Sequence, residues 1–385
     1  MKKDSSTKLI EIALCTIMIV LILLIVSFLI YIYNEQKLDK ETIEFINISE
    51  RKGEITAVAI PEDTSKEEEI VVTINPPTIS RESSVTNTIF TSLNNKFYYN
   101  SLDEYSKQIY MSLDEQKEKM KTGNEIITLP NSIAELLKIE GGEDSIKSIF
   151  TIAMNAFEYD NPDIFYIDVS KVVLFYEVDS LGNYKIYLKN GEEYNHYLIN
   201  AVNSKQEVSN YINELDLEVQ QIKKEINQAN LDTDYKKILY VHDWIVNNSK
   251  YDETLNKENR SNIYGILKEK EATCGGYAKT FKYLMDKLNI NCIIVQGKAT
   301  NDNQTEYHAW NYVELDGKWY GIDCTWDDPI IEGNVPKGTQ RLYHTYFLKG
   351  QNVFNQSHEP LKNFYGTNLE LNYPELEEND YIINF

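Results

Sequence analysis

The stretch that decides the fold is "EATCGGYAKTFKYLMDKLNI", residues 271–290. Its apolar side chains recur at helical spacing after two glycines, which predicts a helix over about residues 275–288. Cys274 therefore stands at the start of that helix. Gly275 and Gly276 carry no side chains, and we expect them to let a substrate backbone come close to the cysteine.

A cysteine at a helix start has two interpretations. An isolated cysteine is most often a small, buried apolar side chain. The positive end of a helix dipole, however, stabilises a thiolate, which is the form in which cysteine acts as a nucleophile. Partner residues further along the chain must decide between the two.

Those partners lie in a predicted β-hairpin. "EYHAWNYVEL" (306–315) and "KWYGIDCTW" (318–326) read as strands, and Asp316-Gly317 between them is a strong turn signal. If residue 315 faces 318, then 310 faces 323, and His308 lies one diagonal step from Asp323. A carboxylate at that position can hold an imidazole ring. Together with Cys274, these residues predict a triad for acyl transfer.

Several motifs follow one another in an order that resembles the transglutaminase-like superfamily of papain-fold cysteine enzymes, in its bacterial branch. Within residues 236–329 they are "VHDWIVNNSKYD", "CGGYAKTFKYLMDKLNI", "VQGKA", "HAWNYVELDGKWYGID" and "TWDDP". The tail "HTYFLKGQNVF" is also similar to the end of such domains. The resemblance implies a papain-like α+β fold, in which the nucleophile helix packs on an antiparallel sheet.

The resemblance also implies roles for the triad. Cys274 is the nucleophile, His308 the general base and acid, and Asp323 the residue that orients the histidine. Thr273 and Gly275 flank the cysteine where the animal enzymes of the family carry Gln and Trp. Hydrolysis is therefore a better expectation for this chain than protein cross-linking.

Enzymes of this family stabilise the oxyanion through the backbone N–H of the nucleophile and often through an aromatic side chain. Tyr277 and Tyr251 are our candidates for that side chain. Gly275 and Trp310 are further candidates for the oxyanion site or the cleft wall. The residues themselves do not identify the second donor.

Changes of composition divide the chain into four parts. We expect a cytoplasmic tail and membrane anchor (1–33), an extended polar linker (34–90), an accessory α/β domain (91–230) and the catalytic domain (231–385). Helices are expected over 101–121 with Ser101 as N-cap, 144–158, 204–228 and 235–249, the last capped by Asp232 or Asp234. Two strands joined at Leu181-Gly182-Asn183 are expected in the accessory domain.

The N-terminal segment predicts the location. Residues 12–33 carry no charge and are long enough to span a bilayer, with Tyr31 and Tyr33 at the far end. A cleaved signal peptide is the alternative interpretation. Lysines flank the segment on both sides, so the flanking charges do not determine its orientation. We assume the usual one, with the short N-terminal tail inside the cell. We expect a single-pass protein whose C-terminal part is extracytoplasmic.

Composition excludes one class of partner and gives no sign of a bound ion. A formal net charge of -22 disfavours nucleic acid, whose binding needs clustered Lys and Arg. The spacing of Cys and His predicts no metal site, and no cofactor motif is present. We expect Cys292 and Cys324 to be buried thiols. His196, His242, His344 and His358 are interpreted as structural or exposed, with support of the catalytic site as the alternative for His242.

Two hypotheses follow for function. The first is a membrane-anchored cysteine enzyme that cleaves or transfers acyl groups at peptide or glutaminyl amide bonds through a thioester. Its substrates would be proteins or peptides of the cell surface or cell wall. The second is a non-catalytic binding or scaffolding module of the cell envelope on the same fold.

Overall fold

The structure is a computed structural model that describes residues 56–57, 96–179, 181–301, 304–328, 343–363 and 369–382. All of them lie in one of the two units into which the chain divides, Ile48–Phe385. Among the described residues, no helix has the length and apolar character needed to cross a membrane. The predicted anchor at residues 12–33 lies outside them.

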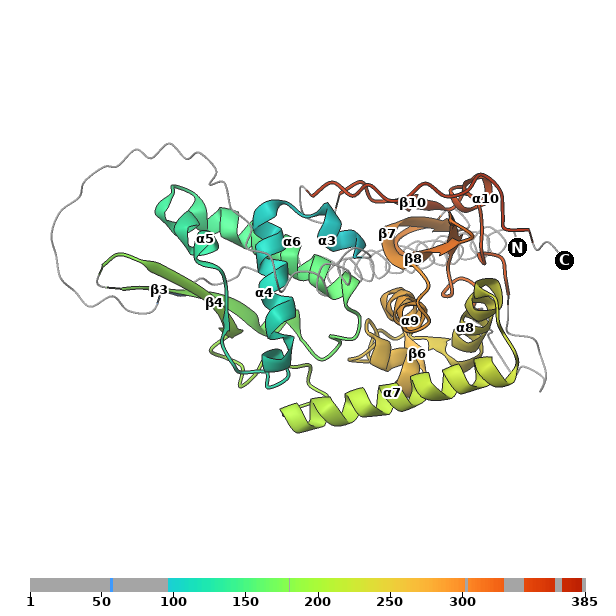
Figure 1. The fold of residues 1–385 in the computed structure, drawn as a ribbon, viewed down its shortest axis with the longest axis horizontal. Helices are drawn as coiled ribbons and strands as arrows, with labels where there is room; N and C mark the ends of the chain where they lie inside the picture. Colours follow the sequence, from blue (N-terminus) through green and yellow to red (C-terminus); the bar gives the residue numbers. More distant parts are fainter. Residues whose placement is uncertain are drawn as a thin grey trace, which may run out of the picture. The chain divides into compact units, whose positions relative to one another are not determined.

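A four-stranded antiparallel sheet is the framework of the C-terminal half. Its strands follow the order β10 (His358–Pro360), β7 (Cys292–Asn301), β8 (Gln304–Leu315) and β9 (Lys318–Ile322). Helix α9 (Cys274–Lys287) packs against β8 and β7 (Figure 1). The predicted α+β class is confirmed, and the predicted nucleophile helix begins one residue earlier than expected.

The hairpin of β8 and β9 has the register that the sequence predicts. Leu315 pairs with Lys318 and Asn311 with Ile322. Asp316 and Gly317 both have positive φ, at 54° and 74°, as the tight turn between two twisted strands requires. The pairing therefore continues toward residues 310 and 323, and His308 lies close to the turn that follows β9.

Asn311 fixes the helix on the sheet. Its side-chain amide donates to the carbonyl of Ala278 in α9 at 3.0 Å and to the carbonyl of Ile293 in β7 at 3.3 Å. Asn311 is buried, so these bonds satisfy a polar group that would otherwise cost free energy. They hold the first turns of α9 against the strand that carries His308.

Three short elements lead from helix α8 (Asp234–Asn248) to α9. They are β5 (Lys250–Tyr251), the π-helical turn η3 (Gly265–Glu269) and β6 (Glu271–Ala272), and β5 pairs with β6 in parallel. The N-cap of α8 is Thr233, whose side chain accepts from the backbone N–H of Lys236. The expected caps Asp232 and Asp234 instead form side-chain bonds with Lys236 and Lys237.

The N-terminal half combines helices with a second sheet. The sheet has the order β1 (Thr56–Ala57), β3 (Val172–Val178), β4 (Tyr184–Asn190) and β2 (Ile127–Thr128). Strand β1 falls in the segment that the sequence predicted to be an extended linker. The other elements are α3 (Phe97–Ser101), α4 (Glu104–Met120), α5 (Asn131–Ala134), η1 (Glu135–Lys138), α6 (Gly142–Asp160), η2 (Val169–Lys171) and α7 (Lys205–Gln228).

One predicted helix start in this half is wrong. The N-cap of α4 is Asp103, whose carboxylate accepts from the backbone N–H groups of Tyr105 and Ser106. Ser101 ends α3 instead, and its hydroxyl donates to the carbonyl of Phe97. The start of α7 follows the sequence, because Ser204 accepts from the N–H of Glu207.

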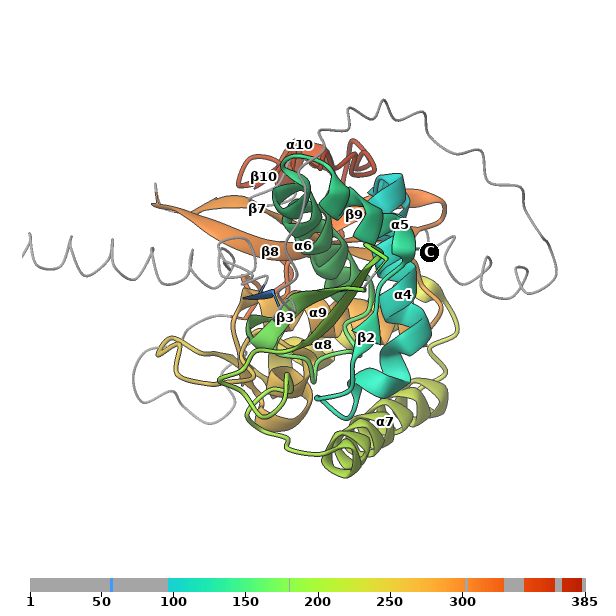
Figure 2. The ribbon, with the colours of Figure 1, turned by 90° about the vertical axis from the view of Figure 1, so that its left-hand side faces the viewer.

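Several polar contacts join the N-terminal half to the sheet and to α9. The hydroxyl of Tyr98 donates to the carbonyl of Ile294 at 2.6 Å, and Lys279 of α9 pairs with Glu158 of α6 at 2.5 Å. Figure 2 shows α6 and α4 together in the N-terminal half. The domain boundary at residue 230 stays a prediction, but contacts cross it directly.

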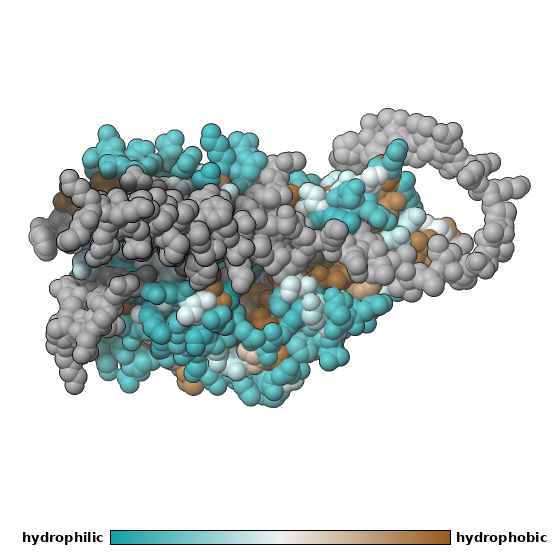
Figure 3. Space-filling model, turned by 180° about the vertical axis from the view of Figure 1, so that it is seen from behind, coloured by the Kyte–Doolittle hydropathy of each residue, from teal (hydrophilic) through white to brown (hydrophobic). Residues whose placement is uncertain are grey.

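The described part of the surface is mostly hydrophilic, as expected for an acidic chain. Seen from behind, hydrophilic residues cover most of the visible described part, with smaller apolar patches between them (Figure 3). The buried apolar side chains gather instead between the sheet and its neighbours, where Ile293, Val295, Trp310, Tyr312, Phe354 and Leu376 form one cluster. Phe354 belongs to the short helix α10 (Gln351–Phe354).

The two glycines after Cys274 have different surroundings, and only one of them needs to be glycine for packing. A Cβ atom at Gly276 would lie 2.4 Å from the carbonyl oxygen of Arg260 and 2.6 Å from Cβ of Ala272. At Gly275 the nearest atom would be 3.7 Å away, in Ser261. Gly276 therefore lets the helix start pack on the chain's own backbone. The expected access for a substrate backbone does not explain it.

This difference predicts opposite results for two matched substitutions. Gly276→Ala should lower the free energy of unfolding by about 1–3 kcal/mol, because the new methyl group overlaps a backbone carbonyl. Gly275→Ala should leave it unchanged or raise it by up to about 1 kcal/mol, the helix-propensity gain of alanine. Urea unfolding of both variants beside the unaltered chain measures the difference. Equal effects of the two substitutions would contradict the packing role of Gly276.

Candidate active site

Cys274 is the first residue of α9. Thr273 is the N-cap in extended conformation, and its carbonyl accepts from the N–H groups of Gly276 and Tyr277 at 2.9 and 3.1 Å. The N–H groups of Cys274 and Gly275 have no acceptor within the helix, as is usual for the first donors of a helix. The cysteine side chain is 6% exposed, so it reaches the surface only narrowly.

His308 and Asp323 meet as the hairpin register predicts. Nε2 of His308 lies 2.7 Å from Oδ2 of Asp323. Cys274 is also among the groups that raise the pKa of His308, which places the thiol near the imidazole. Since Nε2 faces the carboxylate, Nδ1 is the ring atom left for the sulfur. The structure thus brings the three residues of the predicted triad together.

The Asp323 carboxylate is completely buried and hydrogen-bonded on both oxygens. Oδ1 accepts from the backbone N–H groups of Thr325 and Trp326 at 2.9 and 3.2 Å. Oδ2 accepts from His308 and, at 3.1 Å, from Nε2 of His358. The turn after β9 therefore fixes the carboxylate, and the carboxylate fixes two imidazole rings.

His358 is the residue of the site that sequence analysis missed. It begins β10, is buried, and stacks on Phe354 with ring centroids 4.1 Å apart. Its Nδ1 lies 2.9 Å from the hydroxyl of Ser357, so that Nε2 carries the proton donated to Asp323. Burial lowers the pKa of His358 and outweighs the bonds to Asp323. The neutral ring therefore orients Asp323 without neutralising its charge.

The charge state of His308 follows from its neighbours. Burial lowers the pKa of His308, but the charge and hydrogen bond of Asp323, together with Cys274, raise it well above the usual value. Burial raises the pKa of Asp323, but His308 and His358 lower it more, and it ends below its usual value. An imidazolium–carboxylate pair is thus the favoured state, which suits the stabilisation of a thiolate beside it.

Aromatic rings close the site around the histidine. Trp326 stacks on His308 at 5.2 Å between ring centroids, and Trp310 lies at 6.2 Å. Trp310 is buried in the sheet cluster and packs edge-on against His358 at 4.8 Å. Trp310 therefore belongs to the wall behind the triad. The sequence analysis had allowed either the cleft wall or the oxyanion site.

Of the two tyrosines proposed for the oxyanion, Tyr277 lies in the first turn of α9 and Tyr251 in strand β5. The hydroxyl of Tyr277 donates to Oδ2 of Asp328 at 2.5 Å, so this group is already engaged. Tyr251 pairs with Ala272 in the short parallel ladder just before Cys274. Gly275 lies in the first turn of α9 beside the thiol. Nothing in these contacts assigns the second oxyanion donor.

Two further residues near the thiol were not predicted. Tyr159 of α6 is buried, and its hydroxyl accepts from Nε2 of Gln296 in β7. Burial raises the pKa of Tyr159 well above its usual value, and the neighbouring Glu158, Tyr373 and Cys274 act in the same direction. Helix α6 thus contributes to the surroundings of Cys274 from the N-terminal half, where no sequence motif marked it.

The remaining cysteines and histidines differ in their surroundings. Cys292 and Cys324 are free and buried, which confirms the sequence interpretation. His196 bonds to Asn203 on the surface. His242 and His344 both contact Asp243, and His242 also contacts Asp327. This second group of histidines stands apart from the residues that contact Cys274.

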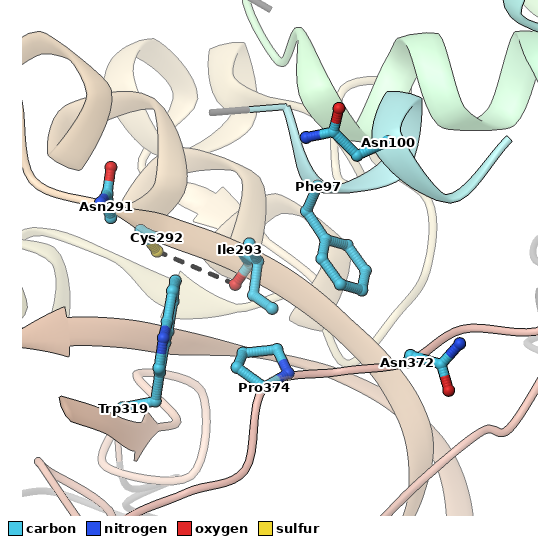
Figure 4. Close-up of a pocket in the computed structure, with 8 residues that line it drawn as sticks. All are labelled: Phe97, Asn100, Asn291, Cys292, Ile293, Trp319, Asn372 and Pro374. Atoms are coloured by element: carbon cyan, nitrogen blue, oxygen red, sulfur yellow. Dashed lines mark hydrogen bonds between the residues drawn. The ribbon is translucent and has the colours of Figure 1, made fainter. Parts of the chain in front are cut away.

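A cavity of about 320 Å³ lies on another part of the sheet. Phe97, Trp319, Pro374 and Ile293 line it together with Cys292 and three asparagines, and Figure 4 shows the rings of Phe97, Trp319 and Pro374 around it. None of the three triad residues lines this cavity. It is therefore separate from the site that contains Cys274.

A cysteine at a helix start, a histidine on the neighbouring sheet and an aspartate just after the next strand form the arrangement that is typical of papain-like cysteine enzymes. Residues 220–324 match the model of the transglutaminase-like superfamily, which supports the resemblance that the sequence motifs predict. The matched segment contains all three residues of the triad. It ends before His358.

Two curated proteins are similar to part of this chain. A stretch of 139 residues is 27% identical to Kyphoscoliosis peptidase of Mus musculus and 28% identical to that of Homo sapiens. The match covers 33% of this chain and 21% of each relative, so the chain spans about a fifth of the length of these curated relatives.

Two solved structures are similar over part of the fold. A crystal structure of a TGase is 15% identical, with a TM-score of 0.27, over 45% of this chain and 49% of that one. A candidate cysteine protease from Cytophaga hutchinsonii is 19% identical, with a TM-score of 0.26, over 40% of this chain and 62% of that one.

The raised pKa of His308 predicts how stability depends on pH. A histidine whose pKa is higher in the folded state stabilises it fully below the unfolded-state value of about 6.5. That contribution is lost as the pH rises through the folded-state pKa. The advantage of the unaltered chain over His308→Gln should therefore be largest below about pH 6.5 and shrink above it. Urea unfolding of both proteins across that range measures it, and an advantage that grows with pH would contradict the assignment.

Proposed function

We propose that the chain is a cysteine enzyme that acts on amide bonds of peptides or proteins. The proposal rests above all on His308, which lies between the buried Asp323 carboxylate and the Cys274 thiol. A histidine in that position can take the thiol proton and hold it as a stabilised imidazolium. The match of residues 220–324 to the superfamily model adds support from an independent comparison.

The reaction has two steps. In the first, Sγ of Cys274 attacks the carbonyl carbon, and His308 takes the thiol proton. The C–N bond then breaks, His308 gives the proton to the departing amine, and a thioester remains on Cys274. In the second step water or an amine attacks the thioester carbon and His308 takes a proton from the attacking group; the C–S bond then breaks, and the proton returns to the sulfur.

Donors for the oxyanion are available at the helix start. The N–H groups of Cys274 and Gly275 have no partner within α9 and lie next to the sulfur. The positive end of the helix dipole favours negative charge at the same place. These groups would stabilise the tetrahedral intermediate, and a further donor from a side chain would add to them.

Hydrolysis is the preferred outcome over amine transfer. The residue after the nucleophile is Gly275, where the resemblance to the cross-linking enzymes fails. The curated relatives carry the name peptidase. The natural substrate would be a protein or peptide, and the proposed anchor would place the enzyme outside the cytoplasm at the cell surface. Cleavage of the C-terminal part by protease added to intact cells tests that location, and full protection would exclude it.

Substitution of the triad tests the proposal. Cys274→Ala should abolish thioester formation, and His308→Gln should lower its rate by about 10²–10⁴-fold, the usual contribution of general acid–base catalysis. Cys292→Ala removes a buried thiol elsewhere in the sheet and serves as the control with an unchanged rate. Mass spectrometry of acyl adducts on Cys274, trapped after incubation with cell-surface extracts, is the measurement.

A fluorescent primary amine in the same incubation separates the two fates of the thioester. Incorporation of the amine into protein means transfer, and shortened peptides without incorporation mean hydrolysis. A chain that forms no adduct, and whose Cys274→Ala variant keeps the cellular role of the protein, would be the non-catalytic envelope module instead.

A further inference from the structure

A second group of histidine and aspartate side chains lies outside the proposed active site. Nδ1 of His242 lies 3.0 Å from Oδ1 of Asp243, and Nε2 of His344 lies 2.7 Å from the same oxygen. These three atoms all lie within 4.8 Å of one another. His242 and Asp243 come from α8, whereas His344 comes from the segment that precedes α10.

The inner face of this group is fixed by a buried carboxylate. Nε2 of His242 lies 3.1 Å from Oδ2 of Asp327, and both side chains are fully buried. Asp327 is held in turn by the backbone N–H of Tyr346, which bonds to both of its oxygens at 3.0 and 3.2 Å. Both ring nitrogens of His242 thus face carboxylates, and once Nδ1 gives up its proton its lone pair is directed at Asp243 and His344.

This is the arrangement in which proteins present a histidine to a metal ion. A ligating imidazole generally donates its other N–H to a carboxylate or carbonyl, which fixes the tautomer and the ring orientation. Asp327 occupies that supporting position for His242. The outer side of the group is open, since the side chains of His344 and Asp243 are 41% and 29% exposed. An ion and a water ligand can therefore enter from solvent.

We infer that His242 through Nδ1, Asp243 through Oδ1 and His344 through Nε2 form a binding site for a zinc-like divalent cation, with Asp327 as the supporting carboxylate. Two imidazoles and one carboxylate suit zinc, whereas magnesium and calcium prefer oxygen ligands alone. Tetrahedral zinc keeps such ligand atoms about 3.3 Å apart. The observed 3.0 and 2.7 Å need only a small opening of the group.

Binding would change the chemistry of the group in a defined way. Each ligating ring nitrogen must be without a proton, so any proton that it shares with Asp243 leaves for solvent. The ion would then join α8 to the segment that begins at residue 343. Through Asp327 it would also brace the turn after β9, since the N–H of Asp327 donates to the carbonyl of Asp323 at 3.2 Å. The sequence predicted no metal site, because His344 lies far along the chain from His242 and Asp243.

Zinc content of the full chain tests the site. After equilibration with zinc and removal of the excess, we expect one zinc ion per chain by elemental mass spectrometry. His344→Gln should lower zinc affinity at least about 10-fold, since it removes a ligand and His344 is exposed enough for the fold to survive. Asp327→Asn should lower it about 10–100-fold, as loss of a supporting carboxylate does.

Two control variants give the test its specificity. His196→Gln removes a surface histidine outside the group and should keep one zinc per chain. His358→Gln should keep it too, because His358 belongs with His308 and Asp323 to a separate group of possible ligands among the described residues. Absence of zinc from the unaltered chain, equal affinity of His344→Gln, or loss of zinc in His358→Gln would each overturn the inference.

Discussion

The structure of the site depends on the burial of one negative charge. Asp323 is completely shielded from water, and a carboxylate in that position is tolerated only when its oxygens are paired. Two backbone N–H groups and two imidazole rings provide the pairing. Strand β8, the turn after β9 and strand β10 therefore converge on a single side chain, and the position of His308 is a consequence of that convergence.

The nucleophile is placed by a separate set of contacts. Asn311 ties α9 to the strand that carries His308, and Gly276 lets the helix start lie directly on the backbone at Arg260. Packing of the helix on the sheet therefore brings the sulfur near the imidazole. Because Lys279 also pairs with Glu158, the N-terminal half of the described chain helps to hold the same helix.

The sequence predicts the local part of this arrangement well. The Asp316-Gly317 turn fixes the register of β8 on β9, so that the approach of His308 to Asp323 follows from counting residues. His358 could not be found in the same way, because it reaches Asp323 from a strand that no short turn connects to the hairpin. Tyr159 and the contact of Asp327 with His242 depend likewise on tertiary packing.

Helix starts and glycines show where sequence patterns are ambiguous. At α4 and α8 several residues could serve as N-cap, and the backbone conformation selects Asp103 and Thr233 among them. From the sequence, a glycine at position 276 suggested room for a substrate backbone. In the structure, close packing of the chain against itself explains why this residue is glycine. In each case the residue type is compatible with two structures, and only contacts distant in sequence decide.

The central claim is that the surroundings of Cys274 make its thiol reactive, and the two other described cysteines test it within one molecule. Cys274, Cys292 and Cys324 are 6%, 3% and 3% exposed, so exposure alone separates them little. Burial raises the pKa of both Cys292 and Cys324, and neither has a histidine base. Peptide mapping after brief treatment of the folded chain with iodoacetamide at neutral pH measures their relative rates. The account predicts modification of Cys274 alone, lost in His308→Gln, whereas similar slow modification of all three would contradict it.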